Sequence, residues 1–598
     1  MAPLRRQVEA AWEERVQRPA RERWAVSWGE VAGWLQGQWT WAVVEQSGVE
    51  GKGRSPAALM VMELGDRVEQ VRTQMTRLQE RWVAAGRSVR SEQVRGVPVL
   101  VLSVPGGGWF ETIVHALRAR GEAGSDAGSA DVSVSGGGGA GQDSFRLVLG
   151  VHRGAMWLSD SPELLERVFA GLDGGPGVAL GESQRVDAGE WAGLSDSMVF
   201  AWAAPGRWLE AAGRASAPEG DGTEDVSAQL WRLAWAVGLS EVRSVTFRWD
   251  LVEEGSRWEC VVRVPEEGRR RLLALLDFDD LDAMPPEWVP GDVTRFYRFR
   301  FSGRRAWSEL EQALAGMGPV WQRVWRFLVE TAQQAGRQRR DDFDLYRDVV
   351  NRLGNDWLYW QGGPRGSGWE AWEGAAGIWL VGSGEAAQLA RSVAEMLAGA
   401  ALRPDAWEER DFLGRTVYSV PIPLAGPPGE PGGEAGRLHM AASERHVGFA
   451  LDPAVLENWL RSLQGLGADS LGSRPGWRAQ VAGMGGGRGW VGYEDYAAML
   501  RGLLAAVKSD PEHLGQARLP GPLGFRLQLQ MAPEQWRPWL DPALLPSWEA
   551  WAPYVGGGWY AFEGDAEALR FRFVVTGGKG GGGRSGTLSG LQSAEGGR

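Results

Sequence analysis

Two hydrophobic patterns succeed each other along the chain. In one, apolar and polar residues alternate, which predicts strands with one buried and one solvent-facing side. In the other, apolar residues recur every three or four positions, which predicts amphipathic helices. The clearest helices are expected over residues 68–82 and 387–397, and the clearest strands over residues 245–249, 260–264, 525–529 and 569–573. This mixture predicts an α+β fold, with a mainly antiparallel sheet packed against amphipathic helices.

The same order of elements occurs twice, which predicts a tandem duplication. A strand entered from a turn at residues 96–105 matches residues 414–423, a shift of 318 positions (414 − 96). The same shift relates Trp39 to Trp357 and Trp41 to Tyr359. A second shift, of 291 positions (453 − 162), relates the strand–turn–helix segment around Pro162 to the segment around Pro453. The same shift relates the later strand that contains Trp202 to the strand that contains Tyr493.

The two sequence shifts indicate how the chain is divided into repeats. We predict a first α+β repeat over residues 1–285, a second over residues 286–576 and a disordered glycine-rich tail over residues 577–598. The shift changes at a Gly- and Ser-rich insertion over residues 121–142, which we predict to be a flexible loop.

The second repeat opens with a strand over residues 295–301 and a helix over residues 306–314. Their counterparts in the first repeat would precede Met1. We therefore expect the first copy to be truncated at its N-terminus, and the missing stretch to be able to carry an export signal.

Helix starts are marked by short polar residues. Ser161 and Asp452 each precede a proline, the expected chemistry of an N-cap followed by a first helical position. Asp344 is also predicted to be an N-cap rather than a catalytic carboxylate, because no histidine or second carboxylate lies at a recognisable spacing.

Composition adds one ambiguity. The 598 residues include 86 glycines and 34 tryptophans, whereas Lys52, Lys508 and Lys579 are the only lysines. A GC-rich bacterial genome accounts for much of this bias, but exposed tryptophans could also form platforms for sugar rings. Burial of the following residues would remove the basis of that alternative: Trp34, Trp39, Trp157, Trp202, Trp357 and Trp379.

Charge and cysteine content exclude several classes. A net charge of −12 argues against a generic nucleic-acid binder. No run of about 18 apolar residues predicts a membrane-spanning helix. The single cysteine, Cys260, excludes an intrachain disulfide and lies in an alternating run where a buried, inert thiol is expected.

The search for catalytic chemistry yields no site, so we predict no catalytic, cofactor-binding or metal-binding residues. The five histidines lack metal-ligand spacing, and His152 and His439 are expected on strands. The acidic cluster at residues 277–282 does not match a calcium loop and is predicted to be a solvated linker. The basic run at residues 269–271 is predicted to be a solvated helix face.

Four segments together resemble a family of exported proteins that carry a domain of unknown function, from planctomycete-type bacteria. The segments are residues 342–354, residues 414–418, residues 242–247 followed by 271–277, and residues 288–294. The resemblance implies export and supplies no catalytic residues.

We therefore expect a non-enzymatic extracytoplasmic protein with a structural or binding role in the bacterial cell envelope. Its partner would be an envelope protein or a polysaccharide, and not a nucleic acid. Two alternatives stay open: a carbohydrate-binding protein that uses exposed tryptophans, and an enzyme with a dispersed site. The expected location is the periplasm or envelope if an upstream signal exists, and the cytoplasm for the sequence as it stands.

Overall fold

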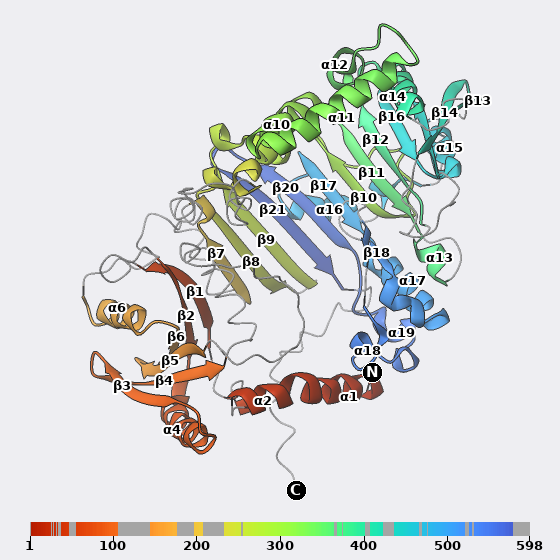
Figure 1. Ribbon diagram of the computed structural model, residues 1–598. Coiled ribbons are helices and arrows are strands. Elements are labelled where there is room, and N and C mark those ends of the chain that lie inside the picture. The colour runs from red at the N-terminus through yellow and green to blue at the C-terminus, as the bar shows by residue number, and fades with distance from the viewer. Residues whose placement is uncertain are drawn as a thin grey trace. The chain divides into compact units, whose positions relative to one another are not determined.

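The chain folds into two compact units. The computed structural model describes residues 2–24, 27, 29–30, 33, 37–46, 55–105, 144–175, 197–206, 233–252, 255–363, 368–373, 375–400, 407–422, 436–465, 469–474, 476–520, 526–528 and 531–577 (Figure 1). The smaller unit comprises Ala2–Asp187 and Glu210–Ala228, and the larger comprises Ala188–Leu209 and Gln229–Arg598 together with Met1. The insertion predicted at residues 121–142 and the tail predicted beyond residue 577 lie outside the described residues.

The smaller unit is built on a six-stranded antiparallel sheet with the order β1-β2-β6-β5-β4-β3. Helix α4 covers one face with buried Val71, Met75, Leu78 and Trp82, and α6 covers the other. The elements are α1 Ala2–Trp12, a π-helical segment Glu13–Gln17, α2 Arg18–Trp24, β1 Trp39–Gln46, β2 Ser55–Glu63, α4 Val68–Ala84, β3 Val89–Val94, β4 Val97–Pro105, β5 Ser144–His152, β6 Ala155–Ser159 and α6 Pro162–Leu172. The predicted helix over residues 68–82 is thus confirmed.

The larger unit is built on a 13-stranded sheet with the order β13-β14-β15-β16-β12-β11-β10-β17-β20-β21-β9-β8-β7. Its strands are β7 Val199–Ala203, β8 Ser244–Val252, β9 Gly255–Arg263, β10 Val293–Phe299, β11 Trp357–Gly362, β12 Gly377–Gly382, β13 Glu408–Phe412, β14 Arg415–Ile422, β15 Gly436–Ala442, β16 His446–Ala450, β17 Trp490–Glu494, β20 Gly558–Gly564 and β21 Ala568–Thr576; β18 Arg518–Pro520 and β19 Arg526–Gln528 pair separately. All described strand pairs are antiparallel, which confirms the predicted α+β class.

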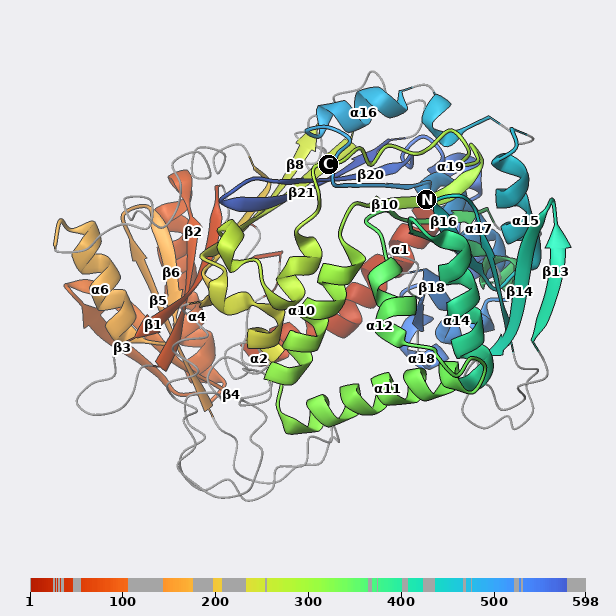
Figure 2. The same ribbon diagram turned by 90° about the horizontal axis from the view of Figure 1, so that it is seen from above.

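Helices lie on both faces of this sheet (Figure 2). They are α10 Gly303–Gly316, α11 Pro319–Arg337, α12 Leu345–Asp348, α13 Gly368–Glu373, α14 Ala386–Ala400, α15 Pro453–Ser462, α16 Trp477–Gly483, α17 Tyr496–Ser509, α18 Pro533–Trp536 and α19 Trp548–Trp551. Helices α15 and α16 bury Trp459 and Trp477 in the core that contains Phe296 of β10, and Trp477 packs edge-on against Phe296. On β14, Val417 faces that core, whereas Tyr418 faces α14. Because successive side chains of a strand point to opposite faces of the sheet, β14 contributes residues to two hydrophobic cores, one on each face.

Two-residue turns fix several hairpins. Arg95 and Gly96 join β3 to β4, and Leu413 and Gly414 join β13 to β14, with positive φ at all four residues. Positive φ at both central positions is typical of a type I′ turn, whose twist matches that of the strands. The turns predicted before residues 97 and 415 are thereby confirmed, and they occupy matching places in the two sheets.

The two runs of elements share one strand order. The smaller sheet, β1-β2-β6-β5-β4-β3, corresponds to β11-β12-β16-β15-β14-β13 of the larger one. Further along the chain, β7-β8-β9 corresponds to β17-β20-β21. Strand β10 lies between β11 and β17, and no described strand of the first run holds the matching place. This order supports the duplication, which stays a prediction.

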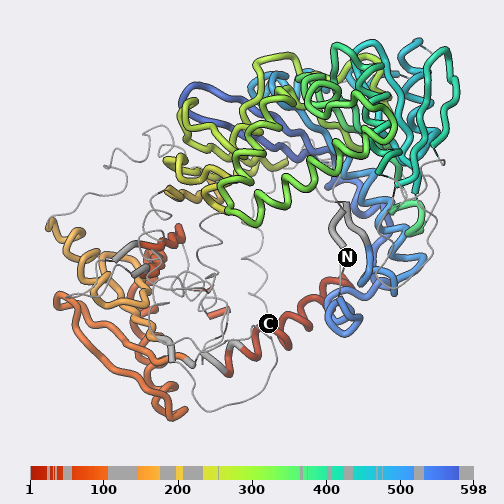
Figure 3. Tube along the Cα trace, turned by 45° about the horizontal axis from the view of Figure 1, so that its top comes forward, coloured from red at the N-terminus to blue at the C-terminus, as the bar shows by residue number. Residues whose placement is uncertain are grey.

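The compact units do not divide at residues 285 and 286, where the sequence repeats divide. Strand β9 pairs with β21 over its whole length, from Gly255 opposite Thr576 to Arg263 opposite Ala568 (Figure 3). The end of the first run therefore belongs to the larger unit, because backbone hydrogen bonds join it to the end of the second run.

Candidate functional site

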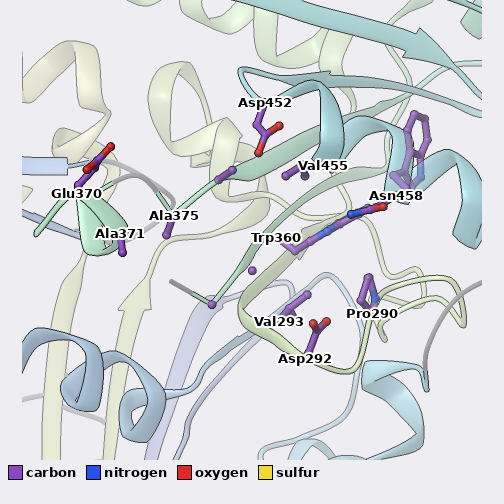
Figure 4. Close-up of a pocket in the computed structure, with 14 residues that line it drawn as sticks. Pro290, Asp292, Val293, Trp360, Glu370, Ala371, Ala375, Asp452, Val455 and Asn458 are labelled. Atoms are coloured by element: carbon purple, nitrogen blue, oxygen red, sulfur yellow. The ribbon is translucent and has the colours of Figure 1, made fainter. Parts of the chain in front are cut away.

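A cavity of about 520 Å³ opens beside the start of β10 and is the candidate binding site (Figure 4). Asp292 comes directly before β10, Trp360 lies on β11, and Glu370 lies on α13. The fourth side comes from α15 and its N-cap. The polar and aromatic residues that line the cavity are Asp292, Trp360, Glu370, Asp452, Asn458 and Trp459.

The local fold explains how the residues around α15 are positioned. Asp452 is the N-cap of α15, where its Oδ1 accepts a hydrogen bond from the N–H of Ala454 at 2.8 Å. Pro453 follows as the first helical residue, so the predicted helix start is confirmed. Trp459 is buried two turns later and packs into the core, which fixes that side of the cavity.

The polarity of the lining limits the ligand. Among the described residues that line the cavity are three carboxylates and one amide, and none of these residues is lysine or arginine. Carboxylate oxygens accept hydrogen bonds from hydroxyl groups or attract cations, whereas they repel phosphates. Trp360 and Trp459 add apolar surface beside these oxygens. The described lining therefore suits a ligand that presents hydroxyl groups or a positive charge better than it suits a phosphate.

Asp356 is the centre of a half-buried charge cluster on the larger sheet. Arg298 donates two hydrogen bonds to its oxygens, each 2.8 Å long, and Nη1 of Arg300 lies 2.6 Å from Oδ2. Nε2 of His446 lies 3.1 Å from the same oxygen. Burial alone would raise the pKa of Asp356, but these hydrogen bonds and the two guanidinium charges outweigh it and hold the pKa well below its usual range.

A second cluster surrounds Asp348, whose side chain is 2% exposed. Arg340 and Arg347 donate to its Oδ2 at 3.0 and 2.9 Å, and the N–H of Asp344 donates to the same oxygen at 2.9 Å. Burial opposes ionisation, but these partners lower the pKa of Asp348 to about 2. Asp344 itself caps α12, as predicted. Ion pairs and the cap of α12 therefore hold the segment 342–354 in place.

A third polar network lies inside the sheet at Glu494. Tyr560 donates to Oε2 at 2.8 Å, Tyr297 donates to Oε1, and Arg295 lies 3.4 Å from Oε1. Tyr496 shares a hydrogen bond of 2.6 Å with Tyr560. Burial and the negative charge of Glu494 raise the pKa of Tyr297 and of Tyr560 far above the usual range, so both keep their protons and donate.

Acid is expected to destabilise the larger unit. Because the pKa of Asp348 is about 2 in the folded state and about 3.9 in unfolded chains, the unfolded state binds more protons, so the stability from Asp348 is complete above the unfolded pKa and lost as pH falls through about 2. We expect Asp348→Asn to flatten the fall of the thermal midpoint between about pH 4 and pH 2. Asp342→Asn, at a carboxylate that is 74% exposed, should leave it unchanged. Equal slopes in wild type and Asp348→Asn would contradict this account.

The tryptophans do not share one environment. Trp157 is buried, and Trp202 and Trp357 are half-buried. Trp39 and Trp379 are 45% and 37% exposed. Trp34 lies outside the described residues. The sugar-platform alternative therefore keeps a basis at two of the positions named for it.

The cysteine and the described histidines considered for chemistry lie on strands or in packing contacts. Cys260 lies half-buried on β9, where burial and then Glu259 raise the pKa of its thiol, in line with an inert residue. His152 lies on β5, and His439 on β15 lies opposite Ser419, whose Oγ is 2.8 Å from Nδ1. Both strand placements were predicted. His115 lies outside the described residues.

The interpretation of residues 269–271 as a solvated helix face is wrong for Arg269. Its side chain is buried, and it donates to Asp277 at 3.1 Å and to the carbonyl oxygens of Val264 and Ala568. The carboxylate and the strand-end carbonyls compensate the buried charge. Asp277, predicted to be part of a solvated linker, is thus an ion-pair partner.

Comparisons with known proteins add no identity: no family model, curated protein or solved structure matches this chain. Within the described residues, no group of three or more histidine, cysteine or acidic side chains is arranged to hold a metal ion. None of the described helices has the length and apolar character needed to cross a bilayer.

Proposed function

We propose that this chain is a non-enzymatic binding protein of the bacterial cell envelope, and that its cavity holds a short stretch of polysaccharide. The main support is that the carboxylates with strongly lowered pKa values are not the carboxylates that line the cavity. Asp348 and Asp356, whose pKa values are strongly lowered, are held in ion pairs that brace the sheet, and neither lines the cavity. Acid–base enzymes usually gather such groups in their pockets.

The lining supports the ligand class. Asp292, Glu370, Asp452 and Asn458 offer hydrogen-bond acceptors from three separate segments of chain around one cavity. Sugars present hydroxyl groups in several directions, so acceptors on several sides suit them better than they suit a flat apolar ligand. The extracytoplasmic location rests on the family resemblance of the sequence.

The test is a calorimetric titration with soluble N-acetylhexosamine oligomers. Asp452→Asn keeps the helix cap, because asparagine caps as well as aspartate, but it removes the charge from the cavity. A hydrogen bond to a charged group contributes about 1.5–3 kcal/mol, so we expect binding to weaken roughly tenfold or more. Asp344→Asn is the matched control, since it makes the same change at the cap of α12.

Other results would decide against the proposal. Turnover of the oligomer that is lost on Asp292→Asn or Glu370→Gln would show an enzyme with a dispersed site. An oligomer that binds equally to wild type and to Asp452→Asn, but not to Trp379→Ala, would favour the exposed-tryptophan platform on β12, where Trp379 packs against Tyr359 at 4.8 Å between ring centroids. No binding at all would remove the polysaccharide from the proposal.

A further inference from the structure

We propose that the edge of β1 on which no described strand pairs is a docking site for an extended strand of a protein partner, with aromatic side chains at alternate positions, that pairs antiparallel to β1. The site is independent of the cavity, which belongs to the other unit. Strand β1 ends the six-stranded sheet, and among the described strands it pairs with β2 alone (Figure 1). Strand addition to such an edge is a common mode of protein recognition.

The first argument is that this edge has little of the usual protection, because Glu45 is the one charged residue of β1. Edge strands are normally shielded by charges, proline or bulges, since their unpaired backbone groups otherwise recruit other strands. Strand β1 reads WTWAVVEQ and pairs with β2 in unbroken register from Trp39 to Gln46. At the opposite end of the same sheet, β3 presents Arg90 and Glu92, both exposed.

The larger sheet shows the same contrast. Its edge strand β13 reads EERDF and is rich in charge, whereas the edge strand β7 reads VFAWA and has none. The two charged edges, β3 and β13, hold matching places in the two runs of elements. The edges with little or no charge are β1, whose one charged residue is Glu45 near its end, and β7. They match β11 and β17, which are the two neighbours of β10.

The second argument is that the larger sheet shows what covers such a strand. Strand β11 matches β1, and its free side is taken by β10, with Tyr297 opposite Tyr359 and Phe299 opposite Trp357. The Tyr297 and Tyr359 rings lie stacked at 6.3 Å between centroids. Tyr359 is accordingly buried, at 7% exposure.

On β1 the corresponding side chains are exposed. By the sequence shift of 318 positions, Trp41 matches Tyr359, yet Trp41 is 47% exposed. Val43, two residues further on the same face, is 38% exposed. Large apolar side chains in a row on a weakly protected edge are costly to leave in water and mark an interaction site.

The chemistry of the occupant follows from β10. Tyr297, Phe299 and Phe301 recur at every second position, and the ring of Phe301 stacks on Trp357 at 5.2 Å between centroids. A strand with this alternation would place its rings over Trp39 and Trp41 and its backbone along β1. The docking partner is therefore an extended segment of the type aromatic–x–aromatic.

The probe for this site is a fluorescent peptide with the sequence of residues 292–301, added to the full-length protein. We expect saturable binding, and protection of the β1 amides from hydrogen exchange. Trp41→Ser should weaken binding at least tenfold, whereas Trp12→Ser, at an exposed tryptophan of α1, should not. A peptide with Tyr297→Ser, Phe299→Ser and Phe301→Ser should bind at least tenfold more weakly.

Several outcomes would overturn the proposal. They are absence of peptide binding, equal binding by wild type and Trp41→Ser, and protection that falls on strands other than β1. Self-association that Trp41→Ser abolishes and the peptide does not displace would assign the edge to a second copy instead. Val43→Ser, a smaller change on the same face, replaces Trp41→Ser if the latter loses the exchange protection of β2 and β6.

Discussion

Replacing Asp356 with alanine is expected to destabilise the larger unit by about 3–5 kcal/mol, because it leaves buried positive charge without its counter-charge. Arg298 and Arg300 are only 12% and 13% exposed, and both contact the Asp356 carboxylate. The two parallel hydrogen bonds from Arg298 are a charge-assisted pair that alanine cannot replace. Protection of β10 and β11 amides against hydrogen exchange reports this loss directly.

The control for Asp356 is Asp342→Ala. Asp342 also contacts arginines, at 3.9 Å to Arg340 and 3.7 Å to Arg347, but its side chain is 74% exposed. Exposed ion pairs contribute less than about 1 kcal/mol, so this variant should keep nearly all of its stability. A loss below about 1 kcal/mol for Asp356→Ala as well would show that the cluster does not brace the sheet.

Replacing Trp82 with alanine is expected to destabilise the smaller unit by about 3–5 kcal/mol. Trp82 is completely buried on α4 and packs with Leu78 and Met75 against the sheet. The loss should appear in the exchange of β4 and β5 amides and not in that of β10 or β11, since the contacts of Trp82 belong to the core of the smaller unit.

The neighbouring Val83 supplies a matched control. It follows Trp82 on the same helix but is 60% exposed, so Val83→Ala removes little buried surface and should change stability by less than about 0.5 kcal/mol. Similar losses in Trp82→Ala and Val83→Ala would mean that α4 does not pack on the sheet by the face described. A loss that spreads to β10 would mean that the two units unfold together.

Features decided by neighbouring residues could be predicted from the sequence. The helix over residues 68–82 follows from apolar spacing, and the caps at Ser161, Asp344 and Asp452 follow from short polar side chains before a helix. The hairpin turn at Gly414 requires positive φ, which glycine adopts without strain. Each of these depends on interactions within a few positions of the chain.

Features that depend on distant segments could not be predicted. Arg572 donates to Glu259 across the β9–β21 pair, 313 positions away, and no local pattern indicates that pairing. Arg269 reads as a surface residue beside other arginines, but strand-end carbonyls reached through tertiary contacts bury it. The sequence does not indicate the cavity for the same reason, since Asp292, Glu370 and Asp452 come from three separate segments.

Exposed tryptophans lie both on the edge strand β1 and, at Trp379, on β12. Trp39 and Trp41 are exposed on β1, where the matching residues Trp357 and Tyr359 are covered by β10. The proposed docking edge would account for their exposure without a sugar platform. Trp379 has no such explanation and keeps the carbohydrate alternative testable at a single position.

The most direct test of the proposed function is a crystal structure of the protein with an N-acetylhexosamine oligomer. The account predicts an intact oligomer in the cavity, with hydroxyl groups donating to Asp292 and Asp452 and no change of covalent structure. A cleaved product in the cavity would contradict the non-enzymatic assignment. An oligomer bound only elsewhere, such as over Trp379, would contradict the assignment of the cavity as the binding site.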